Sequence, residues 1–233
     1  MSILVYDLAA ADPEIRFSPY CWRTRLALAH KGLEADARPW RFTETEVLQP
    51  TGGKTVPTMS HDGRWISDSW AIANYLEDKF PDRPSLFGGD AGRALSRFYN
   101  EWTATTLHAG IIRFVLADIH AILTPADQAY FRTSREQRFG TTLEEFVAGR
   151  EQRLPEFRKS LAPLRATLQA QPFLGGVAPL YPDYIVFGAF QWARSSSRFE
   201  LLEADDPVAR WRDRLLDAFG GLARRAKRPA LAA

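Results

Sequence analysis

The sequence predicts an α/β domain followed by an all-helical domain, and three observations support this fold class. Strand-like and helix-like patterns alternate between residues 3 and 80. The two prolines of Pro81-Asp82-Arg83-Pro84 then interrupt every periodic pattern. Beyond them, apolar residues recur only at helical spacing. We therefore expect a first domain at residues 1–82, a linker at 83–91 and a helical domain at 92–233.

The first domain opens with an apolar run, Ile3 to Leu8, which is rich in strand-forming residues. A polar loop leads to Ser18-Pro19, which predicts a helix start because serine caps helices and proline fits the first helical position. Gly32 marks the end of that helix, and a second strand fits Ala35 to Trp40. The order of elements is therefore strand, helix, strand.

A hairpin and a helix complete the first domain after a polar stretch that contains Gly52-Gly53. Residues 56–60 and 64–67 flank His61-Asp62-Gly63, where a glycine supplies the positive φ that a tight turn requires. Asp68-Ser69 then caps a helix that runs to Phe80. In the second domain we find helical patterns and no strand pair, at 91–122, 126–138, 142–170, 182–195 and 207–226.

Composition and charge exclude several classes of protein. The chain has 233 residues, 45% of them hydrophobic, and a net charge of +2, which are values of an ordinary globular protein without a nucleic-acid surface. We interpret the basic cluster of Arg224, Arg225, Lys227 and Arg228 as a solvated helix end. The longest apolar region, 109–123, is interrupted by charged residues, so we expect neither a membrane span nor a signal peptide.

Cysteine and histidine usage argues against disulfides and metal sites. A single cysteine, Cys21, excludes an internal disulfide and a cysteine-rich zinc site, and it favours a reducing compartment, the cytoplasm. The four histidines share no metal-ligand spacing, so we expect no metal.

Three short segments carry candidate chemistry. The Ser18 hydroxyl would sit at the positive end of a helix, where an anion such as a thiolate is stabilised by ~0.3–1 kcal/mol. Val56-Pro57 stands at the head of a strand and is a candidate cis peptide. Asp68-Ser69 offers a hydroxyl and free N–H groups that suit a carboxylate. Each segment also has an ordinary explanation, as a helix start, a trans proline or a simple cap.

The order and spacing of these segments resemble the glutathione transferase superfamily over nearly the whole chain. Ser18-Pro19-Tyr20-Cys21 is similar to the glutaredoxin sequence CPYC with serine in the first position. Thr55-Val56-Pro57-Thr58 resembles the cis-proline segment of the family, and the stretch from Asp68 to Leu76 resembles its γ-glutamyl-binding helix start. The resemblance implies a thioredoxin-like N-terminal domain, glutathione as cosubstrate and a homodimer.

The resemblance also implies roles for individual residues. Ser18 would hydrogen-bond the glutathione sulfur, and the backbone of Val56, before Pro57, would hold the cysteinyl unit. Asp68 and Ser69 would contact the γ-glutamyl unit. Lys54 would meet the glycyl carboxylate.

Within the superfamily, the segments Ser18 to Thr24 and Asp68 to Trp70 look most like those of bacterial β-etherases and their fungal relatives. One residue departs from the family pattern. A Ser/Thr-x-x-Asp capping arrangement usually starts the core helix of the second domain. Here Asp183 is present, but Leu180 stands three residues earlier, so half of that cap is missing.

The implied reaction is attack by glutathione thiolate on a hydrophobic, aromatic electrophile, with β-aryl ether cleavage as one form of it. The thiolate is the reactive species, and a free thiol with a pKa near ~8.5 is only slightly ionised at neutral pH. The electrophile would lie between the domains against Trp40, Phe42, Trp102 or Phe114, although core packing is the alternative for all four. Two other functions stay open: thiol-disulfide exchange through Cys21, and non-catalytic binding of glutathione or an apolar ligand.

Overall fold

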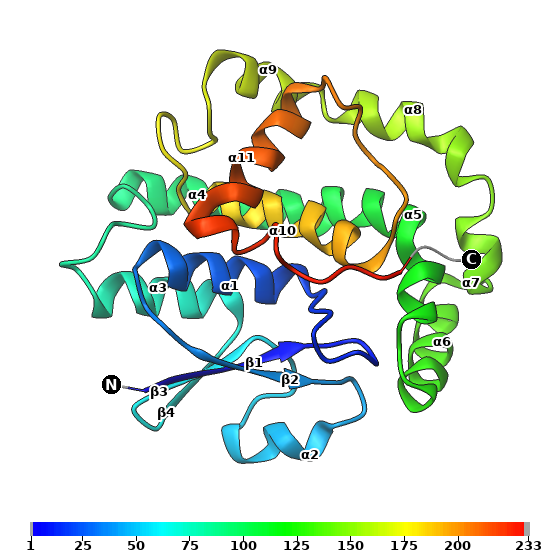
Figure 1. Cartoon of the computed structure of the whole chain (residues 1–233), viewed down its shortest axis with the longest axis horizontal. Helices are drawn as coiled ribbons and strands as arrows, with labels where there is room; N and C mark the ends of the chain where they lie inside the picture. The colour runs from blue at the N-terminus through cyan, green and yellow to red at the C-terminus, as the bar shows by residue number, and fades with distance from the viewer. Residues whose placement is uncertain (1, 231–233) are drawn as a thin grey trace.

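The computed structural model describes residues 2–230, so the outer ends of the predicted domain bounds, residues 1 and 231–233, lie outside the described residues. The chain forms a thioredoxin-like α/β domain and an all-helical domain, as the sequence predicts (Figure 1). A four-stranded sheet in the order β2-β1-β3-β4 builds the first domain. Its strands are β1 (Ile3–Leu8), β2 (Asp36–Trp40), β3 (Thr58–His61) and β4 (Arg64–Ser67).

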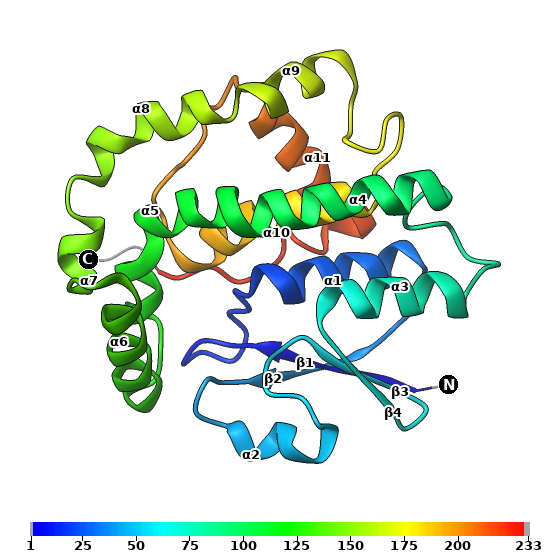
Figure 2. The ribbon, with the colours of Figure 1, turned by 180° about the vertical axis from the view of Figure 1, so that it is seen from behind.

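The sheet is mixed, because β1 pairs with β2 in parallel and with β3 antiparallel. Helices α1 (Pro19–His30) and α3 (Ser69–Lys79) cover the face that looks toward the helical domain, as both views show (Figures 1 and 2). The short α2 (Thr45–Leu48) lies on the other side of the sheet and continues into a 3-10 turn, η1 (Gln49–Thr51). The sequence showed only a polar stretch at these residues.

The second domain consists of helices, which follow the linker in chain order. They are α4 (Asp90–Trp102), the π-helical turn η2 (Thr103–Leu107), α5 (His108–Ala121), α6 (Pro125–Phe139), α7 (Leu143–Val147), α8 (Arg150–Ser160), α9 (Ala162–Ala170), α10 (Tyr181–Ser196) and α11 (Pro207–Gly221). Two long helical patterns are therefore broken into shorter elements. The pattern at 142–170 breaks beside Gly149, which has a φ of 69°, and again at Leu161.

Helix α10 is the central helix of the second domain, and it packs directly on α1. Gly188 makes this contact possible, because a Cβ atom there would lie 2.5 Å from the carbonyl oxygen of Pro19. At the far end of α1, the His30 Nδ1 and the Tyr184 hydroxyl are 2.6 Å apart. The helix that carries Ser18 at its start is therefore fixed against the second domain at both ends.

The start of α10 confirms that the capping arrangement is incomplete. Leu180 has no polar side chain to cap the helix, whereas the Asp183 Oδ2 accepts the Leu180 N–H at 3.0 Å. The same carboxylate also accepts the backbone N–H groups of Leu174 and Gly175 and the indole N–H of Trp211. Asp183 therefore joins the start of α10 to the preceding turn and to α11.

Candidate functional site

Ser18 lies at the N-terminal end of α1, and only 4% of the residue is exposed. Its Oγ accepts the backbone N–H of Cys21 at 3.2 Å, so Ser18 is the N-cap, as the sequence predicts. Pro19 occupies the start of the helix. A serine hydroxyl still has one proton to donate when it accepts such a bond. Ser18 can therefore donate to an anion held at the positive end of α1.

The proline segment lies at the same end of the sheet as Ser18. The Phe17 N–H donates to the Leu8 carbonyl at 3.3 Å, which ties the residue before Ser18 to the end of β1. Strand β3 runs antiparallel to β1 and begins at Thr58, so the chain just before it lies beside that end of β1. The Val56–Pro57 peptide bond is cis, which confirms the sequence prediction.

Asp68 and Ser69 join this group at the start of α3. The Asp68 N–H donates to the Pro57 carbonyl at 3.2 Å. The Asp68 Oδ1 accepts the N–H groups of Trp70 and Ala71 at 2.9 and 3.0 Å. Asp68 has a φ of 80°, a left-handed conformation that is costly for a residue with a Cβ and that concentrates at functional sites. Within residues 2–230 the buried Ser69 Oγ has no hydrogen-bond partner, so it is available to a ligand.

Lys54 stands on the loop that leads to the proline segment, and its side chain is exposed. The neighbouring Gly53 lets this loop approach the end of β4 closely, because a Cβ atom there would lie 2.6 Å from the Ser67 Oγ. Thr58 bonds to the same Ser67 hydroxyl at 2.9 Å. The loop therefore places Lys54 at the rim of the same end of the sheet.

The four aromatic residues of the predicted electrophile pocket fall in different environments. Trp40 is 5% exposed, and its indole N–H donates to the Glu44 carbonyl. Phe114 is 2% exposed and packs between Phe157 and Phe199, so its ring belongs to the core of the helical domain. Trp102 is half-buried at the end of α4, next to η2.

Phe42 is half-buried between the two domains. Its ring lies 6.2 Å from that of Phe17 in the first domain, and 5.9 Å from those of Tyr130 and Phe131 on α6. The adjacent Thr43 donates its N–H and its hydroxyl to a buried carboxylate of α6, Asp127, both at 2.9 Å. These bonds fix Phe42 against α6, so an aromatic wall spans the two domains there.

A polar cluster that was not predicted from the sequence lies beside the start of α1. The guanidinium of Arg23 is fully buried, donates to Asn100 Oδ1 at 2.7 Å, and stands 4.6 Å from the centroid of the Tyr20 ring. Its Nε and Nη2 have no partner within residues 2–230. Burial, with a smaller contribution from the Arg23 charge, lowers the pKa of His108 to about 3, so this histidine is neutral at pH 7. The only sign of this cluster in the sequence was that Arg23 lies within the segment Ser18 to Thr24.

Cys21 is fully buried, three residues after Ser18. Burial raises the pKa of its thiol well above the usual value, and the nearby Asp7 carboxylate raises it further. A buried thiol with a raised pKa is a poor nucleophile.

Among the residues that the structure describes, no three histidine, cysteine, aspartate or glutamate side chains are grouped to hold a metal ion. No helix in this part of the chain is long and apolar enough to cross a membrane.

Comparison with known families accounts for both domains. Residues 17–79 match the glutathione S-transferase N-terminal domain, and residues 94–219 match the glutathione S-transferase C-terminal domain. The chain belongs to the glutathione S-transferase family. The C-terminal match covers more than half of the chain, so the membership does not rest on the first domain alone.

Individual relatives match this chain at low sequence identity or over only part of its length. A probable glutathione S-transferase GSTU1 from Oryza sativa subsp. indica is 33% identical over 102 residues, which are 39% of this chain and 44% of the relative, so the match spans less than half of that relative. Glutathione S-transferase U28 from Arabidopsis thaliana is 25% identical over 179 residues, 75% of this chain and 68% of the relative.

Among solved structures, the chain is similar to glutathione transferase GSTFuA3 from Phanerochaete chrysosporium. The two share 27% identity and superpose with a TM-score of 0.77 over 95% of this chain and 92% of the other. A glutathione S-transferase from Ceriporiopsis subvermispora, CsGST63524, solved in complex with glutathione, has a TM-score of 0.77 and 23% identity over the whole of both chains. At 23% identity, the similarity to CsGST63524 shows a shared fold.

Proposed function

We propose that the protein is a glutathione transferase in which Ser18 donates a hydrogen bond to the sulfur of bound glutathione. The single observation that carries the proposal is the buried Ser18 hydroxyl, which caps α1 and keeps a proton to donate. The helix dipole and the hydroxyl both favour the thiolate over the thiol. A lower thiol pKa raises the nucleophilic fraction of glutathione at neutral pH.

The rest of the glutathione molecule would occupy the end of the sheet that holds Ser18. The γ-glutamyl unit would meet the free carboxylate oxygen of Asp68 and the unpartnered hydroxyl of Ser69. The backbone of Val56, before the cis Pro57, would pair with the cysteinyl unit, and the exposed Lys54 would meet the glycyl carboxylate. Family membership and the shared location of these residues support this assignment.

The electrophile in this proposal is a hydrophobic aromatic compound held between the domains. Phe42, with Tyr130 and Phe131, supplies an aromatic wall, and Trp102 would border it from α4. In ether cleavage, the thiolate would attack the carbon next to a ketone. The C–S bond would form as the C–O bond breaks, and the phenoxide would leave with the electron pair and take a proton from water.

Glutathione binding and thiolate formation test the proposal directly. Calorimetric titration should show binding at or below millimolar glutathione, and ultraviolet absorbance should show the thiolate at a lower pH than for free glutathione. Binding without a shift in the thiol pKa would favour a non-catalytic binding protein. An aryl ether next to a ketone should release its phenol, whereas the same ether with the ketone reduced to an alcohol should not react.

Thiol-disulfide exchange would require Cys21, and its burial argues against that reaction. We expect Cys21→Ala to keep at least half of the transferase activity, because the thiol is shielded from substrate. The measurement is the rate of glutathione conjugation per folded molecule, with the folded fraction taken from circular dichroism. A complete loss of turnover in a folded variant would support the exchange mechanism instead. We also propose a cytoplasmic location, because a chain with a single cysteine has no internal disulfide, which is typical of a reducing compartment.

We propose that the protein forms a homodimer through α4. Leu95 and Phe98 lie three residues apart on this helix, and they are 67% and 66% exposed. Apolar side chains at this spacing share one helix face, and such exposed apolar patches mark interaction surfaces. A second copy of the chain is the partner that the family implies.

We expect the double substitution Leu95→Glu and Phe98→Glu to convert the dimer into a monomer, because each copy would bury two charges at the contact. Light scattering after size-exclusion chromatography measures the mass. Val177→Glu is the matched control, since Val177 is 92% exposed in the loop before α10 and should not affect association. A wild-type monomer, or a dimer that survives the double substitution, would contradict this part of the proposal.

A further inference from the structure

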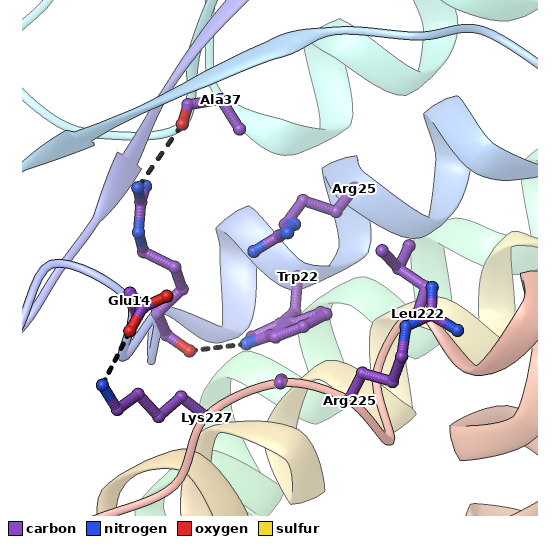
Figure 3. A pocket seen from close by; sticks show the side chains of 9 residues that line it. Glu14, Trp22, Arg25, Ala37, Leu222, Arg225 and Lys227 are labelled. Atoms are coloured by element: carbon purple, nitrogen blue, oxygen red, sulfur yellow. Dashed lines mark hydrogen bonds and ion pairs between the residues drawn. The ribbon is translucent and has the colours of Figure 1, made fainter.

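Tyr20 is an exposed residue in a start of α1 that is otherwise mostly buried. It stands at the second position of the helix and is 36% exposed, whereas Ser18 and residues 21–24 are buried. Residues two apart on a helix point to opposite sides. Trp22 leaves α1 toward the chain segment after α11, where its indole N–H donates to the Arg16 carbonyl at 2.8 Å (Figure 3). Tyr20 therefore points away from that segment.

The Tyr20 side chain meets the second domain at His108, the first residue of α5. The two rings lie edge to face with their centroids 5.3 Å apart, and the Tyr20 hydroxyl is 3.5 Å from the His108 Nδ1. Catalytic hydrogen bonds are often long without substrate and shorten when substrate binds. Trp102, which borders the proposed electrophile pocket, lies one π-helical turn before His108. The Tyr20 hydroxyl thus lies between the domains, beside that pocket.

The π-helical turn η2 (Thr103–Leu107) sets the direction of His108. Such a turn inserts an extra residue into a helix, which rotates every later residue by about 100° around the axis. Single π-helical turns are frequent at functional sites. On its other side the His108 ring packs against Trp192 of α10, with centroids 5.5 Å apart. His108 is therefore held between Tyr20 and Trp192.

His108 leaves the Tyr20 proton free for a ligand. Burial lowers the pKa of His108 to about 3, so at pH 7 its ring carries a single N–H. Its Nε2 is buried and has no hydrogen-bond partner in the part of the chain that the structure describes. A buried N–H without an acceptor is rarer than an unused acceptor, so the proton belongs on Nδ1. From there it donates to the Tyr20 oxygen, and the Tyr20 O–H can donate elsewhere.

The buried guanidinium of Arg23 supports negative charge on the same side chain. It lies 4.6 Å from the centroid of the Tyr20 ring, and its Nε and Nη2 have no partner among residues 2–230. The charge of a buried group is screened less than that of an exposed one. Arg23 and the His108 N–H are therefore placed to stabilise negative charge that develops on Tyr20 during proton transfer.

We propose that Tyr20 is the general acid that protonates the leaving group of the electrophile, an inference that rests on the proposed function. In ether cleavage the C–S bond forms as the C–O bond breaks, and the electron pair goes to the phenoxide oxygen. Tyr20 gives its hydroxyl proton to that oxygen in place of water, and the tyrosinate then takes a proton from water. The substrates that gain most are ethers of weakly acidic phenols, whose phenoxides leave poorly without a proton.

Two ketone ethers with the same ketone half test this role, one with phenol and one with the more acidic 4-nitrophenol as leaving group. The measurement is the single-turnover release of each phenol from protein saturated with glutathione. Tyr20→Phe removes the hydroxyl and keeps the ring. Tyr75→Phe is the matched control, because the Tyr75 hydroxyl forms a similar pair with the His61 Nδ1, at 2.7 Å, outside the proposed site.

Tyr20→Phe should slow the release of phenol about 100-fold and that of 4-nitrophenol less than about threefold, because a poor leaving group depends most on the acid. The glutathione dissociation constant should not change, which separates this effect from one on Ser18. Tyr75→Phe should keep both rates per folded molecule. Unchanged rates in Tyr20→Phe would overturn the inference. Equal losses on the two ethers would also overturn it, because the ring would then only shape the pocket.

His108 acts through Tyr20 as a positioning residue, and its variants test that link. His108→Leu should slow the release of phenol roughly tenfold, again with little effect on 4-nitrophenol. His108→Asn retains an N–H donor and should restore most of the rate. Equal rates for the leucine and asparagine variants would contradict the assigned hydrogen bond.

The failure of this inference is distinguishable from that of the proposed function. A wild-type protein that cleaves neither ether would overturn the role of Tyr20. Calorimetry and ultraviolet absorbance on the same sample then show whether glutathione still binds as the thiolate, in which case the transferase proposal stands.

Discussion

Replacement of Ser18 by alanine should lower kcat/KM for glutathione conjugation about 10- to 100-fold, which is the range for losing one hydrogen bond to a charged group. The glutathione dissociation constant should change little, because the residues proposed to hold the γ-glutamyl unit, Asp68 and Ser69, remain. The pKa of the bound thiol should rise by about one to two units, because each unit corresponds to ~1.36 kcal/mol. The rate profile should therefore shift to higher pH, with the largest loss of rate on its acidic side.

The control for this substitution must account for the structural role of Ser18. Alanine also removes the N-cap of α1, which costs about 0.5–2 kcal/mol of stability. Thr142→Ala removes the N-cap of α7, an element without predicted site residues, and should leave the rate unchanged. Ser18→Thr retains a hydroxyl and should restore most of the rate. A Ser18→Ala variant with unchanged turnover and thiol pKa would show that another group stabilises the sulfur.

Features with a local cause were predictable from the sequence. The hairpin turn depends on Asp62 and Gly63, whose φ values of 47° and 86° are those of the tight turn that the sequence predicted. The caps at Ser18 and Asp68 likewise follow from side chains that bond to N–H groups two or three residues away. These same caps form the candidate glutathione site, so that site was accessible to sequence reasoning.

Features that depend on packing between distant segments were not predictable. The pattern at 91–122 has no proline or left-handed glycine that marks the π-helical turn η2. Phe114 and Phe42 look alike in the sequence, yet the first lies in the core and the second between the domains. Arg23 reads as one more charged residue on a helix, and only its contact with Asn100 across the domain boundary shows that it is buried.

Asp183→Ala should produce the largest loss of stability among the variants proposed here. The carboxylate is fully buried, and it accepts hydrogen bonds from Leu174, Gly175, Leu180 and Trp211 at 2.7 to 3.0 Å. Alanine would leave four donors without this acceptor, the buried indole N–H of Trp211 and three half-buried backbone N–H groups. Each orphaned buried group costs about 1–3 kcal/mol before the structure relaxes, and the half-buried groups cost less because water reaches them. Water entry and relaxation recover part of this cost, so we expect about 3–5 kcal/mol.

Thermal unfolding measures this effect, because ~1 kcal/mol corresponds to roughly 2–4 °C in Tm for a chain of this size. Asp183→Ala should therefore lower Tm by about 6–20 °C. Asp183→Asn keeps the shape of the side chain and one acceptor oxygen. Its Tm should therefore fall between those of the wild-type protein and Asp183→Ala. Asp217→Ala removes an exposed carboxylate of α11 that pairs with Arg224, and it should leave Tm unchanged. Equal Tm values for the Asp183 and Asp217 variants would mean that the four bonds do not hold α10 in place. Helix α10 packs on the start of α1 through Gly188, so unfolding of α10 also removes the proposed glutathione site. The Asp183→Ala variant should therefore bind glutathione in proportion to the fraction of its molecules that remains folded.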